Sequence, residues 1–232
     1  MAGLRTGVKR LIHAAPPVAR QVYRLRHGPF GACLADAWSI PSWLGDQEAL
    51  ALASASYSLP LDAVVVEIGS FLGKSAILLA GARKLRGSGR VHCVDPFDGS
   101  GDAFSVPVYR SIENSERRSL RERFDANIAR AGLNRWVQVH VGTAASIAAG
   151  WSGPIDMLFL DGDQSPEGAS LAYEMWRGHL RVGGIIALHN SSSGEYTPGH
   201  EGLRLLAVHA VKPPEYGDIR SVDTTTFARK LT

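Results

Sequence analysis

Short apolar runs alternate with segments of helical character along most of this chain. Five of the runs are predominantly apolar, which is typical of strands in a parallel sheet with helices on both faces. The runs cover residues 63–68, 91–95, 137–141, 155–161 and 185–189. We expect the covering helices at residues 46–56, 74–86, 120–131 and 167–180. The pattern predicts a doubly wound α/β domain with a mostly parallel sheet.

The last forty residues depart from this alternation. A loop rich in Gly, Ser and Pro follows the fifth run, and residues 202–211 then have helical character. Two short β-rich segments, 219–222 and 225–230, lie close together in the chain. Strands separated by so few residues form a hairpin, so we expect the sheet to end in an antiparallel hairpin.

One connection is unusually long. More than twenty residues separate the run ending at Asp95 from the helix expected near residue 120. Loops of this length inside a compact domain are commonly functional, and this one carries Phe97, Phe104 and Tyr109. We interpret residues 97–118 as a loop that covers the substrate.

Composition adds limits on the class of protein. The chain has 232 residues, of which 45% are hydrophobic and 20% charged, as in a single globular domain with a full core. No apolar run reaches the roughly 18 residues of a membrane span, and the N-terminus lacks a secretory core, so we expect a cytoplasmic protein. The two cysteines, Cys33 and Cys93, are far apart and are interpreted as free thiols.

Positive charge is concentrated in the first 27 residues, which hold six Arg or Lys and no acid. Because the whole chain has a net charge of +3, the remainder is net negative. The apolar positions of this segment fit one helical stripe, interrupted at Pro16-Pro17; they are Leu4, Val8, Leu11 and Ile12. Such a basic amphipathic element suits anionic lipid at the inner membrane face or an acidic partner. A solvated or subunit-packing arm is the alternative.

We divide the chain into a basic arm with a helical extension, residues 1–44, and a single domain, residues 45–232. The domain shows no basic stripe with interleaved aromatic residues, so nucleic acid is not an expected partner. The sequence leaves the oligomeric state open, and a homo-oligomer is compatible with it.

The most informative stretch is residues 64–75, an apolar strand that ends in Glu67 and passes through Gly69 and Gly73 into a helix. A glycine turn of this kind brings the backbone close to a ligand. A dinucleotide site requires Gly-x-Gly-x-x-Gly, whereas residues 71 and 72 are Phe and Leu. A phosphate loop requires four residues between its glycines, and this chain has three before Lys74 and Ser75. Glu67 would also repel phosphate but would suit a cationic ligand.

Acidic and polar residues end four of the five strands. In open parallel sheets, ligands bind at the carboxyl ends of the strands. The residues in question are Glu67, Asp95, Asp161 with Asp163, and His189 with Asn190. Asp95 follows Gly69 by 26 residues, a spacing that suits a carboxylate binding both hydroxyls of a ribose.

Residues 67–73, Glu-Ile-Gly-Ser-Phe-Leu-Gly, resemble motif I of the class I S-adenosylmethionine-dependent methyltransferases, and Asp95 matches their ribose-binding acid. The resemblance covers residues 45–230 and implies a seven-stranded Rossmann-like sheet. It implies that motif I contacts the methionine and sulfonium part of the cofactor, and that residues after the third strand border the adenine. The implied cofactor residues are Glu67, Gly69, Ser70, Phe71, Gly73, Asp95, Gly142, Thr143 and Asp161.

Residues 155–165 and 183–190 resemble the bacterial O-methyltransferases of the macrocin and cephalosporin-biosynthesis type, which act on sugars and natural products. This resemblance implies a divalent metal, Mg²⁺ or Mn²⁺, at Asp161, His189 and Asn190. It implies that Asp163 takes the proton of the acceptor.

The chain departs from that subgroup at the metal positions. It has Gln164 where relatives commonly have His, and His189 or Asn190 where they have a carboxylate. An imidazole and an amide suit Mn²⁺ better than Mg²⁺. Two alternatives stay open: His189 and Asn190 cap the strand, or His189 is itself the general base, with His200 a weaker candidate.

The resulting hypothesis is an S-adenosylmethionine-dependent O-methyltransferase acting on a hydroxyl of a small molecule or a glycan acceptor. A metal at Asp161 would assist by lowering the pKa of that hydroxyl. The alternatives are a cofactor-binding regulatory module without catalysis, a P-loop-like phosphotransferase and an NAD enzyme.

Overall fold

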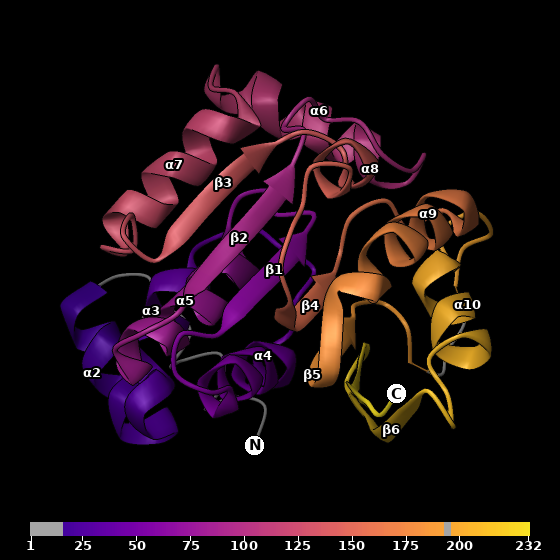
Figure 1. Ribbon diagram of the computed structural model, residues 1–232. Coiled ribbons are helices and arrows are strands. Elements are labelled where there is room, and N and C mark those ends of the chain that lie inside the picture. Colours follow the sequence, from indigo (N-terminus) through magenta and orange to yellow (C-terminus); the bar gives the residue numbers. More distant parts are fainter. Residues whose placement is uncertain (1–15, 193–195) are drawn as a thin grey trace.

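The computed structural model describes residues 16–192 and 196–232, and a seven-stranded sheet runs through its centre (Figure 1). The strands lie in the order β3-β2-β1-β4-β5-β7-β6. They are β1 (Val64–Ile68), β2 (Arg90–Asp95), β3 (Val137–Val141), β4 (Ile155–Leu160), β5 (Leu180–Leu188), β6 (Tyr216–Val222) and β7 (Thr225–Lys230). The first five strands pair in parallel, whereas β7 is antiparallel to β5 and β6. The predicted doubly wound fold with a terminal hairpin is confirmed.

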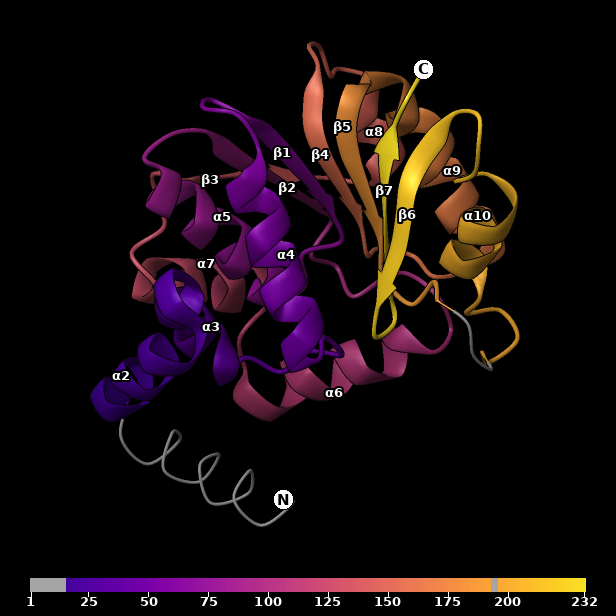
Figure 2. The ribbon, with the colours of Figure 1, turned by 90° about the horizontal axis from the view of Figure 1, so that it is seen from below.

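Helices cover both faces of the sheet (Figure 2). The α-helices are α2 (Pro16–His27), α3 (Gly31–Trp38), α4 (Asp46–Ser58), α5 (Lys74–Arg86), α6 (Ser105–Glu116), α7 (Leu120–Arg130), α8 (Ala144–Ala148), α9 (Pro166–Trp176) and α10 (Gly202–His209). Short 3₁₀ helices, η1 (Gly28–Phe30) and η2 (Arg177–His179), join α2 to α3 and α9 to β5.

Two apolar cores follow from this layering. Helices α3, α4, α5 and α7 pack on one face, and α8, α9 and α10 pack on the other. Strand β4 serves both cores, because Phe159 points into the first and Leu158 and Leu160 into the second. All six residues of β4 are buried, which explains why its sequence is apolar without alternation.

Several predicted element boundaries shift, and β6 begins at Tyr216 rather than at residue 219. The helix expected to reach residue 180 ends at Trp176, and β5 begins at Leu180 rather than at residue 185. Leu180 pairs with Ile155 of β4, and the register shifts before Met157 pairs with Ile185. Gly183 lies in this stretch with a φ of 81°, so the irregular backbone hid the start of the strand from the apolar pattern.

The connection expected as a loop over residues 97–118 instead contains helix α6. Asp102 starts this helix by accepting hydrogen bonds from the backbone nitrogens of Phe104 and Ser105, both 3.0 Å long. Tyr109 and Ile112 pack against the first core. Pro107 is tolerated because it lies in the first turn, where the backbone N–H has no partner within the helix.

The N-terminal extension joins the first core through α3, where Cys33, Leu34 and Ala37 are buried. Cys33 and Cys93 are both free and buried, as predicted. Of the predicted basic arm, residues 1–15 lie outside the described residues. Among the residues that are described, no helix has the length and apolar character needed to cross a membrane.

Candidate active site

The carboxyl ends of β1, β2 and β4 open into a cavity of about 320 Å³, here called the larger cavity. Four carboxylates line it: Asp95, Asp102, Asp161 and Asp163. Most of the remaining wall is apolar and includes Ile68, Val94, Leu120 and Leu171. No Lys, Arg or His of the described chain lines this cavity. The larger cavity therefore favours a ligand that combines an apolar body with positive charge.

The glycine turn after β1 forms one wall of the larger cavity. Gly69 has a φ of 87°, and a Cβ at this position would lie 2.4 Å from the carbonyl oxygen of Asp161. Gly73 has a φ of 86° and precedes α5. Only glycine satisfies both the left-handed backbone and the contact with the end of β4, so the turn can lie directly against the adjoining strand.

Asp95 fixes the conformation of that turn. Its Oδ2 accepts hydrogen bonds from the backbone nitrogens of Ser70 (2.8 Å) and Phe71 (2.9 Å), and its Oδ1 accepts one from Phe97 (2.7 Å). Burial raises the pKa of Asp95, and these three backbone donors partly oppose the rise. The residue predicted to bind a ribose thus lines the larger cavity and also holds the glycine turn.

Glu67 lies behind the turn and lines neither cavity described here. The carboxylate is fully buried, and its Oε2 accepts a hydrogen bond from Ser70 Oγ at 2.5 Å. Its Oε1 is also buried and has no hydrogen-bond partner among the described residues. Burial raises the pKa of Glu67 to about 7. Glu67, which was predicted to contact a cofactor, therefore reaches neither cavity directly. Ser70, to which it is bonded, lines the smaller cavity.

Of the two residues predicted to border the adenine, Thr143 lines the larger cavity and Gly142 does not. Thr143 lines the larger cavity, and its Oγ1 accepts a hydrogen bond from the backbone nitrogen of Ser146 (3.1 Å), which caps α8. Gly142 is not among the lining residues. A Cβ on Gly142 would lie 2.8 Å from the side chains of Ser146 and Ile147, so its role is close packing against α8.

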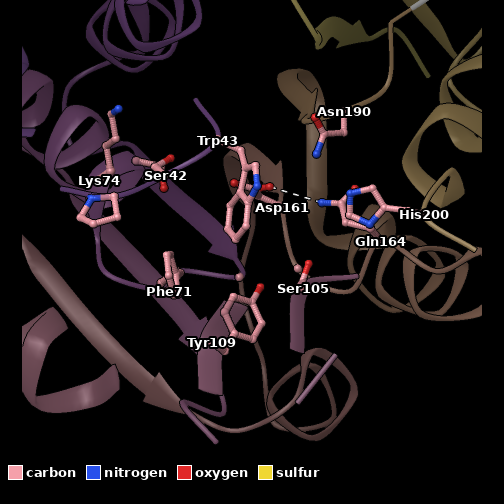
Figure 3. Close-up of a pocket in the computed structure, with 15 residues that line it drawn as sticks. Ser42, Trp43, Phe71, Lys74, Ser105, Tyr109, Asp161, Gln164, Asn190 and His200 are labelled. Atoms are coloured by element: carbon pink, nitrogen blue, oxygen red, sulfur yellow. Dashed lines mark hydrogen bonds between the residues drawn. The ribbon is translucent and has the colours of Figure 1, made fainter. Parts of the chain in front are cut away.

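A smaller cavity of about 40 Å³ adjoins the larger one (Figure 3). The two share the walls formed by Gly69, Phe71, Tyr109, Asp161 and Gly162. Three aromatic rings pack together at the smaller cavity: the Phe71 centroid lies 5.0 Å from that of Tyr109 and 5.7 Å from that of Trp43. Lys74 also lines this cavity, and its Nζ donates to the carbonyl of Leu44 (3.2 Å).

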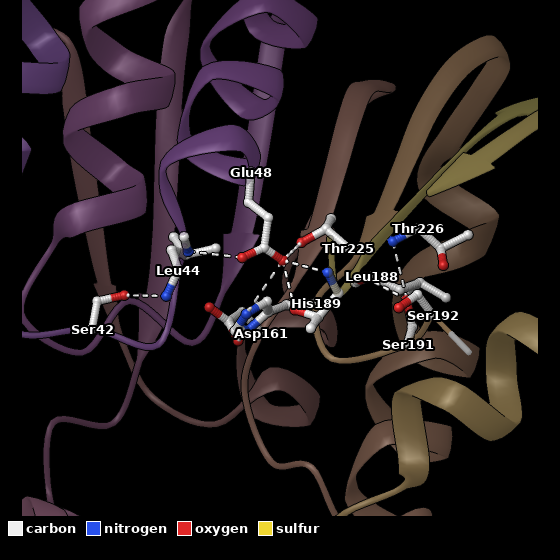
Figure 4. A network of polar contacts seen from close by, with 12 residues as sticks. Ser42, Leu44, Glu48, Asp161, Leu188, His189, Ser191, Ser192, Thr225 and Thr226 are labelled. Carbon is white, nitrogen blue, oxygen red and sulfur yellow. Dashed lines mark hydrogen bonds and ion pairs between the residues drawn. The ribbon is translucent and has the colours of Figure 1, made fainter. Parts of the chain in front are cut away.

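Asp161 lies at the junction of the two cavities and is tied to His189 (Figure 4). The Nδ1 of His189 lies 2.6 Å from Asp161 Oδ1, and its Nε2 lies 3.9 Å from Glu48 Oε1. Burial by itself would lower the pKa of His189, but the charge and hydrogen bond of Asp161, together with Glu48, raise it. His189 is 2% exposed and lines neither cavity.

The predicted metal residues are only partly brought together, and their role as metal ligands stays a prediction. The Nδ1 of His189 is used on Asp161, whereas its Nε2 is buried without a hydrogen-bond partner among the described residues. Asn190 lines the smaller cavity, but His189 does not. Within the described ranges, no three His, Cys, Asp or Glu side chains form a group able to hold a metal ion. The structure instead agrees with the alternative in which His189 orders the end of the strand.

Asp163 and Gln164 follow Asp161 and point in different directions. Asp163 lines only the larger cavity, and its Oδ1 accepts a hydrogen bond from the backbone nitrogen of Ser165 (2.9 Å). Gln164 lines the smaller cavity and donates from Nε2 to Asp161 Oδ1 (3.3 Å). Its Oε1 is buried without a partner among the described residues, so it can accept a hydrogen bond from a ligand.

Several lining residues were not named as site residues in the sequence analysis, although Tyr109 lies in the segment predicted there to cover the substrate. Trp43 and Ser42 come from the connection before α4, and Asp102 and Tyr109 come from the segment expected to be a loop. A usable signal existed only for Asp102: an Asp three residues before Ser105, at the start of a segment with helical spacing, is a helix N-cap pattern.

Comparisons with known proteins agree with this fold. A family model described as a methyltransferase domain matches residues 66–191. The O-methyltransferase TomG from Streptomyces achromogenes, involved in tomaymycin synthesis and solved with S-adenosylmethionine, is 18% identical (TM-score 0.59; 88% of this chain and 90% of that chain covered). An O-methyltransferase from Bacillus cereus, solved with S-adenosylhomocysteine, is 17% identical (TM-score 0.59; 88% and 90% covered).

The similar structures differ in their acceptors. An rRNA methylase from Streptococcus thermophilus is 13% identical (TM-score 0.54; 82% of this chain and 100% of that chain covered). At these identities the likeness shows the fold, and the acceptor has to be argued from the site. The family model covers more than half of the chain and includes β1, β2, β4 and β5 with their carboxyl ends. The chain therefore belongs to the methyltransferase-domain family and has the fold of the class I S-adenosylmethionine-dependent methyltransferases.

Proposed function

We propose that this protein transfers the methyl group of S-adenosylmethionine to a hydroxyl of a small molecule or a sugar-containing acceptor. The observation that carries the proposal is that the two cavities meet at one wall, formed by Phe71, Tyr109 and Asp161. A methyl group held in the larger cavity at this wall lies next to an oxygen held in the smaller one. Methyl transfer requires this arrangement, because the acceptor oxygen must attack in line with the bond that breaks.

The larger cavity suits S-adenosylmethionine in both shape and charge. Its apolar wall can cover the adenosine, and its four carboxylates can attract the sulfonium and the ammonium group. Asp95, at the end of β2, is the residue we assign to the ribose, and Thr143 is assigned to the adenine end. Asp161, at the junction of the cavities, is assigned to the sulfonium.

The same carboxylates argue against the alternative cofactors. A triphosphate or a dinucleotide pyrophosphate would bring negative charge into a cavity with four acidic side chains and no basic one from the described chain. In a phosphate loop, the lysine that follows the second glycine points at the phosphates. Lys74 instead lines the smaller cavity and donates to Leu44.

The smaller cavity has room only for the reacting end of an acceptor. Trp43 is 44% exposed and packs on Phe71 and Tyr109, so the remainder of the acceptor would lie against aromatic rings at the entrance. Aromatic surfaces of this kind accommodate the apolar faces of rings, and Gln164 Oε1 supplies one acceptor for a hydroxyl proton.

Isothermal titration of the full chain with S-adenosylhomocysteine, ATP and NAD tests the proposal. We expect saturable binding of S-adenosylhomocysteine alone. Saturable binding of ATP or NAD without S-adenosylhomocysteine would reject the proposal. Binding of S-adenosylhomocysteine without methylation of any hydroxyl compound offered together with S-adenosylmethionine would favour the regulatory module instead.

A further inference from the structure

A hydrogen bond links a residue that lines the smaller cavity to one that lines the larger cavity. His200, in the connection between β5 and α10, has its Nδ1 3.1 Å from Oδ1 of Asp102, which lies in the connection between β2 and α6. The two residues are 98 positions apart in the chain. His200 lines the smaller cavity and Asp102 the larger one, so this contact is part of the site rather than of the distant core.

The Asp102 carboxylate is fixed from several directions. It is 4% exposed, and its Oδ1 accepts hydrogen bonds from the backbone nitrogens of Phe104 and Ser105, while its Oδ2 accepts a weaker one from Gln164 (3.4 Å). Burial opposes the charged form, but the bonds from Ser105 and the nearby His200 ring together lower the pKa of Asp102. Asp102 is therefore a buried anion with a fixed direction toward His200.

The ring of His200 is held equally firmly. It packs on Phe104 with ring centroids 4.6 Å apart. Its backbone nitrogen donates to the carbonyl of Thr197 and to Glu201 Oε2, both at 2.9 Å. Because a carboxylate only accepts hydrogen bonds, Nδ1 of a neutral ring carries the proton, and Nε2 carries a lone pair. No described residue hydrogen-bonds to this Nε2.

We propose that His200 is the general base of the methyl transfer and that Asp102 is the residue that positions it. The proposal rests on the proposed function of the same site. In the step, His200 Nε2 takes the proton of the acceptor hydroxyl while the acceptor oxygen forms a bond to the methyl carbon. The carbon–sulfur bond breaks, and its electron pair stays on sulfur, which becomes the neutral thioether of S-adenosylhomocysteine. The positive charge moves to the imidazole, where Asp102 stabilises it, and the proton then leaves to water.

His200 was the weaker candidate in the sequence, and the other bases predicted there are less suitably located. His189 is buried between Asp161 and Glu48 and reaches neither cavity. Asp163 lines only the larger cavity. Asp161 does reach the junction, but its Oδ1 accepts from both His189 and Gln164, and its charge faces the cavity assigned to the sulfonium. Of these residues, His200 alone lines the smaller cavity with an available imidazole lone pair.

Other charged and titratable groups lie around His200. Asp161, Lys74 and Tyr109 share the smaller cavity with it, and Glu201 is bonded to its backbone. Burial raises the pKa of Tyr109 above its ordinary value, so the phenol stays neutral while an imidazole titrates.

A first test needs no acceptor. Full-length protein with ¹⁵N-labelled histidine rings is saturated with S-adenosylhomocysteine, and the His200 resonances are assigned by their loss in His200→Gln. We expect the neutral ring to carry its proton on Nδ1, and Asp102→Asn to shift the ring toward the Nε2-protonated form. A wild-type ring with its proton on Nε2 would overturn the proposal, because the lone pair would then face Asp102.

A second test measures turnover with catechol and methyl α-glucoside as acceptor probes. His200→Gln should lower kcat by about 10²- to 10⁴-fold while the Kd for S-adenosylhomocysteine changes less than about twofold. Added imidazole should partly restore the activity of His200→Ala, which a purely structural role would not allow. His209→Ala, at the exposed end of α10, is the matched control.

The two proposals fail in different ways. A wild-type protein that does not bind S-adenosylhomocysteine contradicts the proposed function itself. Normal binding, with kcat of His200→Gln within about threefold of wild type, contradicts only the assignment of His200. If neither probe is methylated by the wild type, the proton position on the His200 ring decides the question.

Discussion

At the scale of single residues, Asp95 has two roles: it lines the larger cavity and it holds the glycine turn. The spacing from Gly69 predicted a carboxylate at the ligand, and the structure adds three backbone hydrogen bonds that hold the glycine turn. Asp95→Asn replaces an oxygen that accepts these bonds with an amide group that donates. We therefore expect a turn that is poorly held as well as a weakened ribose contact.

The first prediction concerns this substitution. Asp95→Asn should weaken the binding of S-adenosylhomocysteine by about 1 to 3 kcal/mol, the range for a lost hydrogen bond to a charged group. Isothermal titration measures the affinity, and urea unfolding reports the separate effect on stability. Unchanged affinity in a folded variant would remove Asp95 from the binding site.

Glu67 gives a second prediction, because a buried carboxylate oxygen without a partner makes stability depend on pH. The pKa of Glu67 rises from 4.5 to about 7 in the folded protein. Between these values the folded state keeps a proton that the unfolded chain has released, so rising pH destabilises the fold over this window. By linkage the loss is on the order of 3 kcal/mol above pH 7.

Glu67→Gln removes the charge and keeps an oxygen for the hydroxyl of Ser70. The variant should have about the wild-type stability near pH 4.5 and should be more stable than the wild type at pH 8. Urea unfolding at the two pH values measures the difference. The same pH dependence in both proteins would show that Glu67 is not the titrating group.

At the scale of elements, the side chain of Glu48 holds α4 to the terminal hairpin by hydrogen bonds. Glu48 Oε1 accepts hydrogen bonds from the nitrogen and hydroxyl of Thr224 and from the hydroxyl of Thr225, and Oε2 accepts one from the nitrogen of Gly45. The side chain is almost fully buried and also faces His189. Glu48 thus joins α4, the terminal hairpin and the end of β5. Its loss would leave several hydrogen-bond donors without a partner.

Glu48→Ala should therefore destabilise the protein by about 3 to 5 kcal/mol, the usual cost of removing one partner from a buried polar network. Asp125→Ala is the control, since Asp125 forms an exposed ion pair with Arg121 that should contribute less than about 1 kcal/mol. Urea unfolding compares the two variants. Equal effects would mean that the Glu48 network adds little to the stability of the hairpin.

The ends of β4 and β5 carry a prediction about metal ions. Because no three His, Cys, Asp or Glu side chains of the described residues form a group able to hold a metal ion, we expect neither Mg²⁺ nor Mn²⁺ to raise the melting temperature of the protein, and chelation with EDTA not to lower it. Differential scanning calorimetry with each ion in excess, and with EDTA, tests this. A rise with Mn²⁺ that is lost in Asp161→Asn would restore the predicted metal site.

The same elements show how far sequence patterns reach. The runs identified all five parallel strands; burial on both faces makes β4 apolar throughout, whereas the edge strand β3 alternates apolar and polar residues and was found from its valines. Helix α6 was missed because Gly, Ser and Pro residues around its start have the composition of a loop, although Asp102 caps it. The acids at the strand ends were correctly assigned to one edge of the sheet. The partners of His189 and His200 come from α4 and from the β2–α6 connection, and no local pattern links residues so far apart.

At the scale of the whole molecule, positive and negative charge occupy different regions. The cavities at the carboxyl edge of the sheet are lined by carboxylates, whereas the N-terminal segment holds six basic residues and no acid. In α2, Arg24 and Arg26 are exposed, and Leu25 between them is 81% exposed. A large apolar side chain flanked by arginines suits the surface of an anionic membrane. The arginines can bind the lipid headgroups while the leucine enters the apolar boundary below them.

The last prediction follows from this separation of charge. Full-length protein should sediment with vesicles that contain phosphatidylserine and should remain in solution with phosphatidylcholine alone, and a chain that begins at Gly28 should sediment with neither. Removing α2 leaves the buried residues of α3 in the first core, so the shortened chain should keep its affinity for S-adenosylhomocysteine. Raising the salt concentration should release the full-length protein, because attraction between exposed charges is screened beyond about 8 Å at physiological ionic strength. If both chains partition equally, the segment is not a membrane contact, and its charge must serve a protein partner or solvation.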